Sequence, residues 1–262
     1  MAQIIDYMDF IFDGVPSTFN DVYIISTDSW NTERIFGLKS SIETEDGIGD
    51  MKLFNRRKND SYSFDVEIAK LDDWNTPKSV SEKEYDDIIR WLMTDEPKVF
   101  QVKGIVHFGT FISATEFHNT KRQGIIKLQF ESIYPYAFSS IISTQLKINQ
   151  NKTFKLENKS NINNKKVYLD IDIKKTSSSG SVTIKNKRIN KYFTINNLEL
   201  NEEIQIKGDG CFEILSLTNA DKNLFNDVEY DSFPYLVYGT NEMEVIGDCK
   251  IQIKYQMPMA LR

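Results

Sequence analysis

Apolar and polar side chains alternate along most of this chain of 262 residues, and this alternation constrains the fold more than any other feature. In residues 61–69 every second position is apolar, namely Tyr62, Phe64, Val66 and Ile68. The same pattern occurs in residues 126–131, 167–173 and 249–256. Because successive side chains of a strand point to opposite faces, a period of two is typical of half-buried strands. The sequence therefore predicts a mainly β protein.

Residues 81–93 have the period of a helix instead. Their apolar side chains lie at the i, i+3, i+4 and i+7 positions of an amphipathic helix: Tyr85, Ile88, Ile89 and Leu92. Ser81 and Glu84 have the spacing of a capping box, in which each side chain binds an amide that the first turn leaves free. An isolated helix of this length is marginal in water, so we expect it to pack on a sheet.

The chain is predicted to contain two domains, residues 1–140 and 141–262. Tyr134-Pro135-Tyr136 interrupts a strand, because proline donates no hydrogen bond to a sheet. The charge then changes, from 15 basic and 23 acidic residues before the boundary to 17 basic and 15 acidic after it. Turn signals such as Asn196-Asn197 recur in the second half at the spacing of short strands. We expect an N-terminal β-sandwich with one packed α-helix, followed by a second β-sandwich.

Sequence motifs give little support to an enzyme. His107 and His118 do not form the HExxH pattern of zinc hydrolases, and neither GxSxG nor a phosphate-binding loop occurs. Cys211 and Cys249 lack the spacing of a zinc site, so both are predicted to be buried thiols. No apolar run reaches the ~20 residues that span a bilayer. We expect no catalytic residues, no metal, no cofactor and no membrane partner.

Short motifs follow one another in a fixed order through both halves of the chain. The first half contains an apolar segment and turn in residues 10–17, an Asp46-Gly47 turn, a helix ending in Trp91-Leu92, and a strand closing on Tyr134-Pro135-Tyr136. The second half contains residues 154–158, 239–242 and 250–255. In this order the motifs resemble those of the distal tail proteins of long-tailed, non-contractile phages (siphophages) that infect Gram-positive hosts. The resemblance covers nearly the whole chain.

This resemblance implies a structural role without turnover. Distal tail proteins form a hexameric ring of N-terminal domains that joins the tail tube to the tail tip. Their C-terminal domain is galectin-like or similar to a carbohydrate-binding module. The implied partners are further copies of the chain, the tail tube protein, and the tail-associated lysin or receptor-binding protein. The implied location is the virion, at the tail tip of a phage or prophage, after assembly in the cytoplasm of the host bacterium.

The basic stretch 52–58 is a candidate for contacts between subunits of such a ring. We expect it to meet an acidic patch on the neighbouring subunit, in a heterologous contact that closes into a ring. The residues of this predicted contact are Arg56 and Arg57 on one side, and either Asp72 with Asp73 or Asp86 with Asp87 on the other.

The acidic segment 43–50 is a candidate for the lumen of the ring. A lumen that lets DNA pass needs charge of the same sign as phosphate, because a basic lining would release counterions and retain the strand. We expect this segment to be a loop that lines the lumen with Glu43, Glu45, Asp46 and Asp50. DNA is then expected only in transit, without specific nucleic-acid binding.

Two other functions remain open from the sequence. The chain is alternatively a carbohydrate-binding or receptor-binding tail module whose second domain recognises a glycan of the host cell wall. A glycosidase with a pair of carboxylates is a further alternative. All three tryptophans, Trp30, Trp74 and Trp91, lie in the first half, so the second domain offers no strong aromatic platform for a sugar. The sequence therefore assigns no residues to a glycan site.

Overall fold

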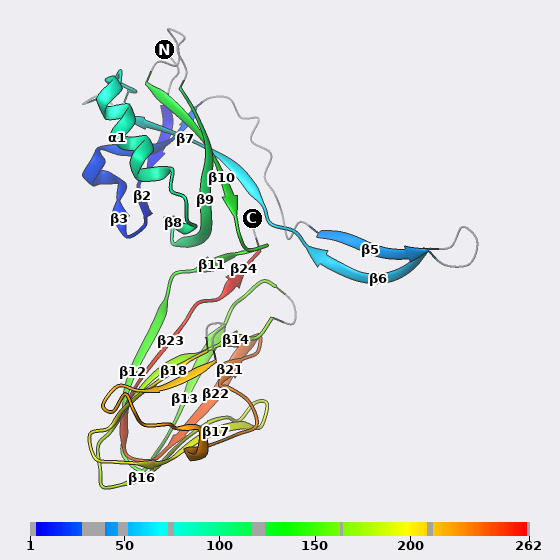
Figure 1. Cartoon of the computed structure of the whole chain (residues 1–262), viewed down its shortest axis with the longest axis vertical. Coiled ribbons are helices and arrows are strands. Elements are labelled where there is room, and N and C mark those ends of the chain that lie inside the picture. Colours follow the sequence, from blue (N-terminus) through cyan, green and yellow to red (C-terminus); the bar gives the residue numbers. More distant parts are fainter. Residues whose placement is uncertain are drawn as a thin grey trace. The chain divides into compact units, whose positions relative to one another are not determined.

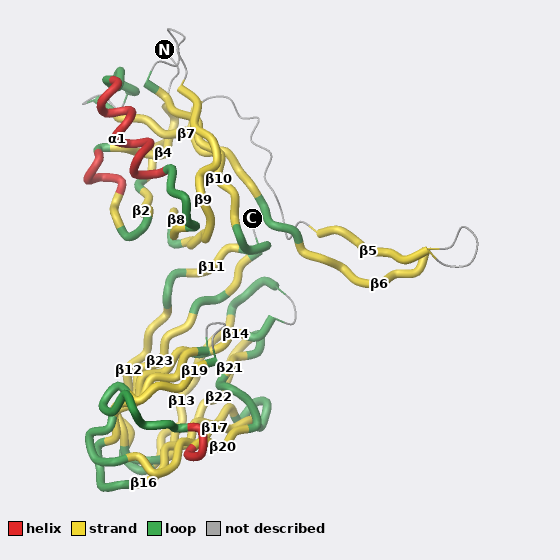
Figure 2. Tube along the Cα trace, viewed as in Figure 1, coloured by secondary structure: helices red, strands yellow, loops and turns green. Residues whose placement is uncertain are grey.

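The computed structural model describes residues 4–27, 40–46, 52–72, 76–116, 124–162, 165–208 and 212–260. The chain divides into two compact units: unit 1 contains residues 1–139 and 259–262, and unit 2 contains residues 140–258 (Figure 1). Strands make up most of the described residues, and one α-helix is present among them (Figure 2). The predicted fold class, mainly β with one packed helix, is confirmed.

Unit 1 is built on an antiparallel sheet of ten strands. Eight of them follow the order β1-β4-β7-β10-β9-β8-β2-β3, and β11 pairs with both β9 and β24. The strands are β1 (Ile4–Met8), β2 (Phe10–Phe12), β3 (Val15–Pro16), β4 (Val22–Thr27), β7 (Ser63–Lys70), β8 (Lys98–Val102), β9 (Ile105–Glu116), β10 (Ile125–Ser132), β11 (Ala137–Ser139) and β24 (Pro258–Met259). A 3-10 helix, η1 (Ser17–Asn20), follows β3. The alternating segments 61–69 and 126–131 become β7 and β10, as predicted.

The helix α1 (Glu82–Leu92) begins at the predicted capping box. The Ser81 backbone amide donates to Glu84 Oε2 at 3.0 Å, and the Glu84 amide donates to Ser81 Oγ at 3.4 Å. The hydrogen bond from the Ser81 amide, with the ammonium of Lys70 at 2.9 Å, lowers the pKa of the Glu84 carboxyl to about 2. The helix is therefore fixed at its first turn, and its apolar side is directed at the sheet.

Aromatic side chains fill the space between α1 and the ten-stranded sheet. Ile88 and Leu92 of the helix are buried against five phenylalanines that four strands contribute: Phe10, Phe12, Phe100, Phe111 and Phe130. Trp91 stacks on Phe10 with ring centroids 5.6 Å apart. The helix and the sheet thus share one core, which gives a short helix the tertiary support that it lacks alone.

Two strands of unit 1 form a separate hairpin. β5 (Ser40–Asp46) and β6 (Lys52–Asn59) form a two-stranded sheet, and among the described strands neither pairs with a third (Figure 1). A two-stranded sheet leaves one edge of each strand without backbone partners.

Unit 2 is a sandwich of two antiparallel five-stranded sheets. The β12 sheet has the order β12 (Ile142–Ile148), β23 (Cys249–Tyr255), β15 (Asp170–Lys175), β18 (Glu203–Lys207), β19 (Glu213–Ser216). The β13 sheet has the order β13 (Asn151–Asn158), β22 (Gly239–Ile246), β16 (Gly180–Asn186), β17 (Lys191–Leu198), β20 (Val228–Tyr230). A small sheet of β14 (Val167–Tyr168) and β21 (Tyr235–Leu236), and the 3-10 helix η2 (Phe225–Asp227), complete the unit.

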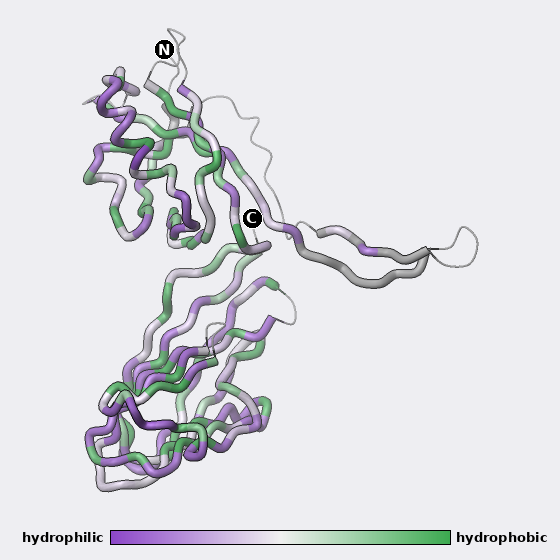
Figure 3. The backbone as a smooth tube through the Cα atoms, in the orientation of Figure 1, coloured by the Kyte–Doolittle hydropathy of each residue, from purple (hydrophilic) through white to green (hydrophobic). Residues whose placement is uncertain are grey.

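Hydrophobic and hydrophilic residues alternate along strands of this sandwich (Figure 3), and buried positions alternate with less buried ones in β15 and β23. Its core is rich in β-branched residues, for example Ile171 and Ile253 of the β12 sheet and Ile195 of the β13 sheet. The prediction of a turn at Asn196-Asn197 was wrong, because both residues lie inside β17. They fall where the register between β16 and β17 shifts, and Asn197 has φ +54°. The asparagines therefore mark a bulge, since asparagine tolerates the left-handed conformation.

Replacement of Leu92 by alanine tests the helix–sheet core. Leu92 is fully buried, so Leu92→Ala should lower the free energy of unfolding of unit 1 by about 2–5 kcal/mol. Urea unfolding followed by tryptophan fluorescence reports on unit 1 alone, because all three tryptophans lie in residues 1–139. Arg90→Ala, at an exposed position of the same helix, should change the free energy by less than about 1 kcal/mol. Equal effects of the two variants would contradict the packing described.

Candidate interaction surfaces

The hairpin carries both sets of residues that the sequence singled out in segment 40–59. Glu43, Glu45 and Asp46 lie on β5, whereas Arg56 and Arg57 lie on β6. The expectation that Glu43 begins a loop was wrong, because residues 43–46 pair along β6 instead. Acidic residues are disfavoured in strands on average, but the stability of a strand also depends on its pairing with a neighbouring strand, which the local sequence does not show. Asp50 lies outside the described residues.

The register of the hairpin sets unlike charges opposite each other. Glu43 is the partner of Arg56, and Asp46 is the partner of Lys52, while Arg57 lies opposite Ile42. One strand of the hairpin is therefore acidic and the other basic.

Three of the four predicted acidic partners of the arginines are described, and they lie in two different surroundings. Asp72 accepts hydrogen bonds from the Thr76 amide at 2.8 Å and the Thr76 hydroxyl at 2.5 Å, so its carboxylate closes a loop. Asp73 lies outside the described residues. Asp86 and Asp87 are exposed on α1, where Asp87 is 3.5 Å from the guanidinium of Arg90. The helix thus presents a pair of acids on its outer side.

An exposed apolar site of unit 1 escaped the sequence analysis. Phe19, in η1, is 79% exposed, and Val15 at the preceding strand is exposed as well. Single exposed apolar side chains are common on protein surfaces, so these two residues alone do not define an interface. The available signal was a phenylalanine within the polar run Ser17-Thr18-Phe19-Asn20, which is an unusual place for a core residue.

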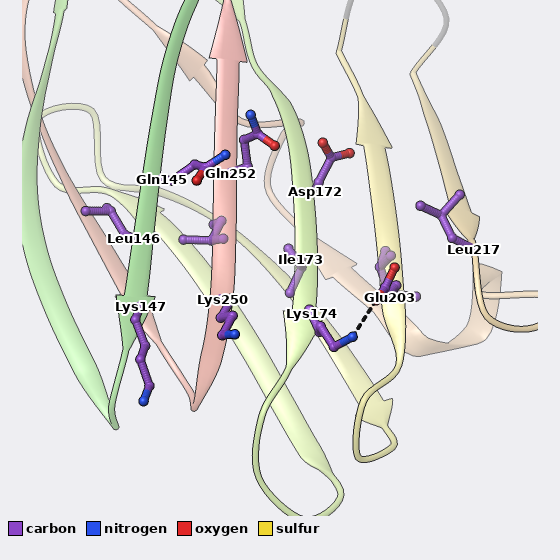
Figure 4. Close-up of a pocket in the computed structure, with 12 residues that line it drawn as sticks. Gln145, Leu146, Lys147, Asp172, Ile173, Lys174, Glu203, Leu217, Lys250 and Gln252 are labelled. Atoms are coloured by element: carbon purple, nitrogen blue, oxygen red, sulfur yellow. Dashed lines mark hydrogen bonds and ion pairs between the residues drawn. The ribbon is translucent and has the colours of Figure 1, made fainter.

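Unit 2 has a groove on the polar face of the β12 sheet. The groove has a volume of about 430 Å³ and is lined by side chains of β12, β23, β15 and β18, with Leu217 at one side (Figure 4). Its polar lining residues are amides, lysines and acids, and none is aromatic. Residues of this groove are far apart in the sequence, so only the strand register brings them together.

Aromatic residues gather elsewhere in unit 2. The rings of Tyr168 and Phe212 meet edge to face, with their centroids 4.8 Å apart. The centroid of Phe212 is in turn 5.1 Å from that of Phe233. Tyr230, which is 53% exposed, packs on Phe233 at 5.6 Å. These rings use their faces and edges on one another, so they do not form a flat open platform of the kind that stacks on sugars.

His107 is a core residue. It is buried among phenylalanines, and its Nδ1 lies 2.7 Å from the hydroxyl of Tyr62. Burial raises the pKa of Tyr62 to about 12 and lowers that of His107 to about 4, so both side chains are neutral near pH 7. His118 lies outside the described residues.

The described part of the chain contains one cysteine, Cys249. Cys249 is fully buried, and desolvation raises the pKa of its thiol to about 11, which matches the predicted buried thiol. Cys211 lies outside the described residues. Among those that are described, histidine, cysteine and acidic side chains form no group of three suited to a metal ion. The helices in the same residues are all too short or too polar to cross a bilayer.

Comparison with known proteins identifies the family. Residues 5–133 match the family model described as a phage tail protein N-terminal domain, and residues 136–255 match the one described as a phage tail C-terminal domain. The chain therefore belongs to this family of phage tail proteins. Over 271 residues it is 21% identical to the SPbeta prophage-derived uncharacterized protein YomH of Bacillus subtilis (strain 168). This match covers 94% of the present chain and 96% of YomH.

A solved structure shares the fold. The Dit protein (gp 19.1) of SPP1 matches 96% of this chain and 99% of its own, with a TM-score of 0.65 at 10% sequence identity. That protein is described as a paradigm of the hub adsorption apparatus in Gram-positive infecting phages. The resemblance to distal tail proteins, inferred from the order of motifs, is thus confirmed.

The lowered pKa of His107 predicts a loss of stability at acidic pH. Between about pH 6.5 and pH 4 the unfolded chain binds a proton at His107 that the folded chain does not. The free energy of unfolding of unit 1 should therefore be highest above pH 6.5 and fall by about 3 kcal/mol toward pH 4 from this group. His107→Phe should flatten that part of the pH profile, measured by urea unfolding and tryptophan fluorescence. An equally steep profile in the variant would contradict the assignment.

Proposed function

We propose that this phage tail protein is a structural component of the tail tip that forms a closed hexameric ring. The ring links the tail tube protein to the tail-associated lysin or receptor-binding protein, and the chain catalyses no reaction. Membership of a phage tail family and the shared fold with a hub protein support this role. The ring is part of the virion, at the tip of its tail, and is assembled in the cytoplasm of the host bacterium.

The observation that carries the proposal is the β5–β6 hairpin. A two-stranded hairpin without further strands or a packed face is marginal in water. The described strands of the chain provide no third strand for it, so a surface of another copy is the natural source of support. Such a contact joins two different patches, the hairpin of one copy and a surface of the next copy. The same contact repeats from copy to copy until the ring closes.

Charge suggests how the contact is oriented. Arg56 and Arg57 of the hairpin meet Asp86 and Asp87 of α1 in the next protomer. The pair on α1 is favoured over Asp72, because Thr76 binds both carboxylate oxygens of Asp72, whereas Asp86 is exposed and Asp87 has only a contact of 3.5 Å to Arg90. Rim charges of this kind contribute more to specificity and association rate than to affinity.

The acidic strand β5 faces the lumen in this arrangement. Glu43, Glu45 and Asp46, with Asp50, give the passage the same sign of charge as the DNA backbone. DNA passes in transit and is not retained. The basic residues of β6 are then occupied by the neighbouring protomer.

A second function is supported by the groove of unit 2. A groove of about 430 Å³ with many polar side chains is suited to a hydroxyl-rich ligand, which agrees with recognition of a host-wall glycan by the second domain. This function is compatible with the ring, because the two use different units of the chain.

Charge reversal in the hairpin tests the ring. Mass photometry of the wild-type protein should show a species of about 180 kDa, as expected for six chains of 30.4 kDa. Arg56→Glu with Arg57→Glu should shift the protein to the monomer mass, and adding Asp86→Lys with Asp87→Lys should restore the ring. The control Lys152→Glu with Lys155→Glu makes the same charge change at exposed positions of β13. A wild-type protein that stays monomeric at all concentrations would refute the proposal.

Reversal of the acidic strand tests the lumen. Rings with Glu43→Lys, Glu45→Lys and Asp46→Lys should bind duplex DNA at least about tenfold more tightly than wild-type rings at 0.1 M salt. Fluorescence anisotropy of labelled DNA measures this. Glu199→Lys, Asp221→Lys and Asp231→Lys change the charge equally at exposed sites of unit 2 and should have little effect. DNA affinity that rises equally in both sets would remove β5 from the lumen.

A further inference from the structure

Three lysines lie side by side across the polar face of the β12 sheet. In the register of the strands Lys147 of β12 is opposite Lys250 of β23, and Lys250 is opposite Lys174 of β15. We call these residues the lysine row. Like charges directly opposite each other on neighbouring strands destabilise a sheet. The sequence therefore carries a local electrostatic cost on this face.

The fold compensates only one member of the row. Lys174 lies 2.6 Å from Glu203 of β18, and Lys254, elsewhere on the face, lies 2.9 Å from Asp172. Lys147 and Lys250 have no acidic partner among the residues that the structure describes. Both side chains are exposed, so these two adjacent positive charges are accessible to a ligand. Positions that oppose stability without compensation within the fold are typical of functional sites.

Amides lie directly beside the lysines. Two residues away along each strand, and therefore on the same face, Gln145 is opposite Gln252, and Gln252 is opposite Asp172. Figure 4 shows this amide row and the lysine row at successive levels of the groove. A primary amide both donates and accepts hydrogen bonds, which suits hydroxyl groups, whereas an ammonium only donates. The groove therefore combines cationic sites with sites for neutral hydroxyls.

The groove has the wrong composition for a protein partner. Protein interfaces are enriched in aromatic, methionine and arginine residues and depleted in lysine at their centre. The lining contains no aromatic residue, methionine or arginine, and it contains three lysines. The strands β23 and β15 are paired on both sides, so a peptide cannot add to them as a further strand. A ligand that lies over these two strands must be recognised by side chains alone.

We propose that this face binds an anionic polymer in which phosphodiester groups alternate with hydroxyl-bearing polyol or sugar units. Lys147 and Lys250 hold a phosphodiester, and Gln145 and Gln252 bind the hydroxyls of the adjoining unit. Phosphate fits better than carboxylate, because lysine acts as a point charge on a tetrahedral anion while planar carboxylates favour the fork of arginine. The proposal gives the glycan-binding function of unit 2 a ligand class and does not depend on the ring.

Calorimetric titration of the full-length protein with a synthetic glycerol phosphate oligomer tests the site. The wild-type protein should bind it, and Lys147→Gln with Lys250→Gln should weaken the affinity by about tenfold or more. Lys152→Gln with Lys155→Gln removes the same charge from exposed positions of β13 and should leave the affinity unchanged. The Lys147→Gln, Lys250→Gln variant should also melt at an equal or higher temperature, because it relieves repulsion within the lysine row. A folding defect would instead lower that temperature.

Further titrations distinguish the alternatives. Neutral dextran should not bind, and poly-L-glutamate should bind at least about tenfold more weakly than the glycerol phosphate oligomer. Absence of oligomer binding, equal loss in both lysine variants, or equal affinity for poly-L-glutamate would overturn the proposal. The mass of the same samples reports on the ring separately. A ring that binds no oligomer refutes this site alone, and a monomer that binds it refutes the ring alone.

Discussion

A β-strand is stable in water only when its backbone groups are paired and one of its faces is buried, and this constraint organises the whole chain. Ten strands of unit 1 satisfy it through a single sheet whose face packs on α1. The two sheets of unit 2 satisfy it by burying their isoleucine-rich faces against each other. The two-stranded sheet β14–β21 satisfies only part of it, since its outer edges are unpaired but Val167, Tyr235 and Leu236 are buried. The β5–β6 hairpin likewise leaves both of its outer edges without a partner among the described strands. The proposed ring follows from that exception.

The same constraint explains where ligand recognition is possible. The inner face of the β12 sheet is committed to the core, so its outer side chains can vary without loss of packing. Lys147 and Lys250 use this freedom at a cost in electrostatic energy, which a bound polyanion would remove. In the proposed function the two units have independent tasks: unit 1 provides assembly, and unit 2 provides a face for ligand recognition.

Local signals in the sequence predicted the elements, and long-range pairing decided the rest. Ser81 and Glu84 predicted the start of α1, because a capping box acts within one helical turn. Alternation predicted β7, β10 and β23, because it too is a pattern within a single segment. The strand β5 escaped prediction because its acidic residues favour a loop until β6 pairs with them. Asn196-Asn197 indicates a left-handed backbone, but only the neighbouring strand determines whether this becomes a turn or a bulge. The lysine row could not be predicted, since Lys147 and Lys250 become neighbours only through the register of β12 and β23.

Electron cryo-microscopy of the purified protein tests the central claim most directly, because it images the contact between copies as well as their number. We predict class averages of a closed annulus with six-fold symmetry, in which each β5–β6 hairpin lies against the neighbouring protomer. Images of separate monomers, of open filaments, or of a ring whose hairpins contact no neighbour would contradict it.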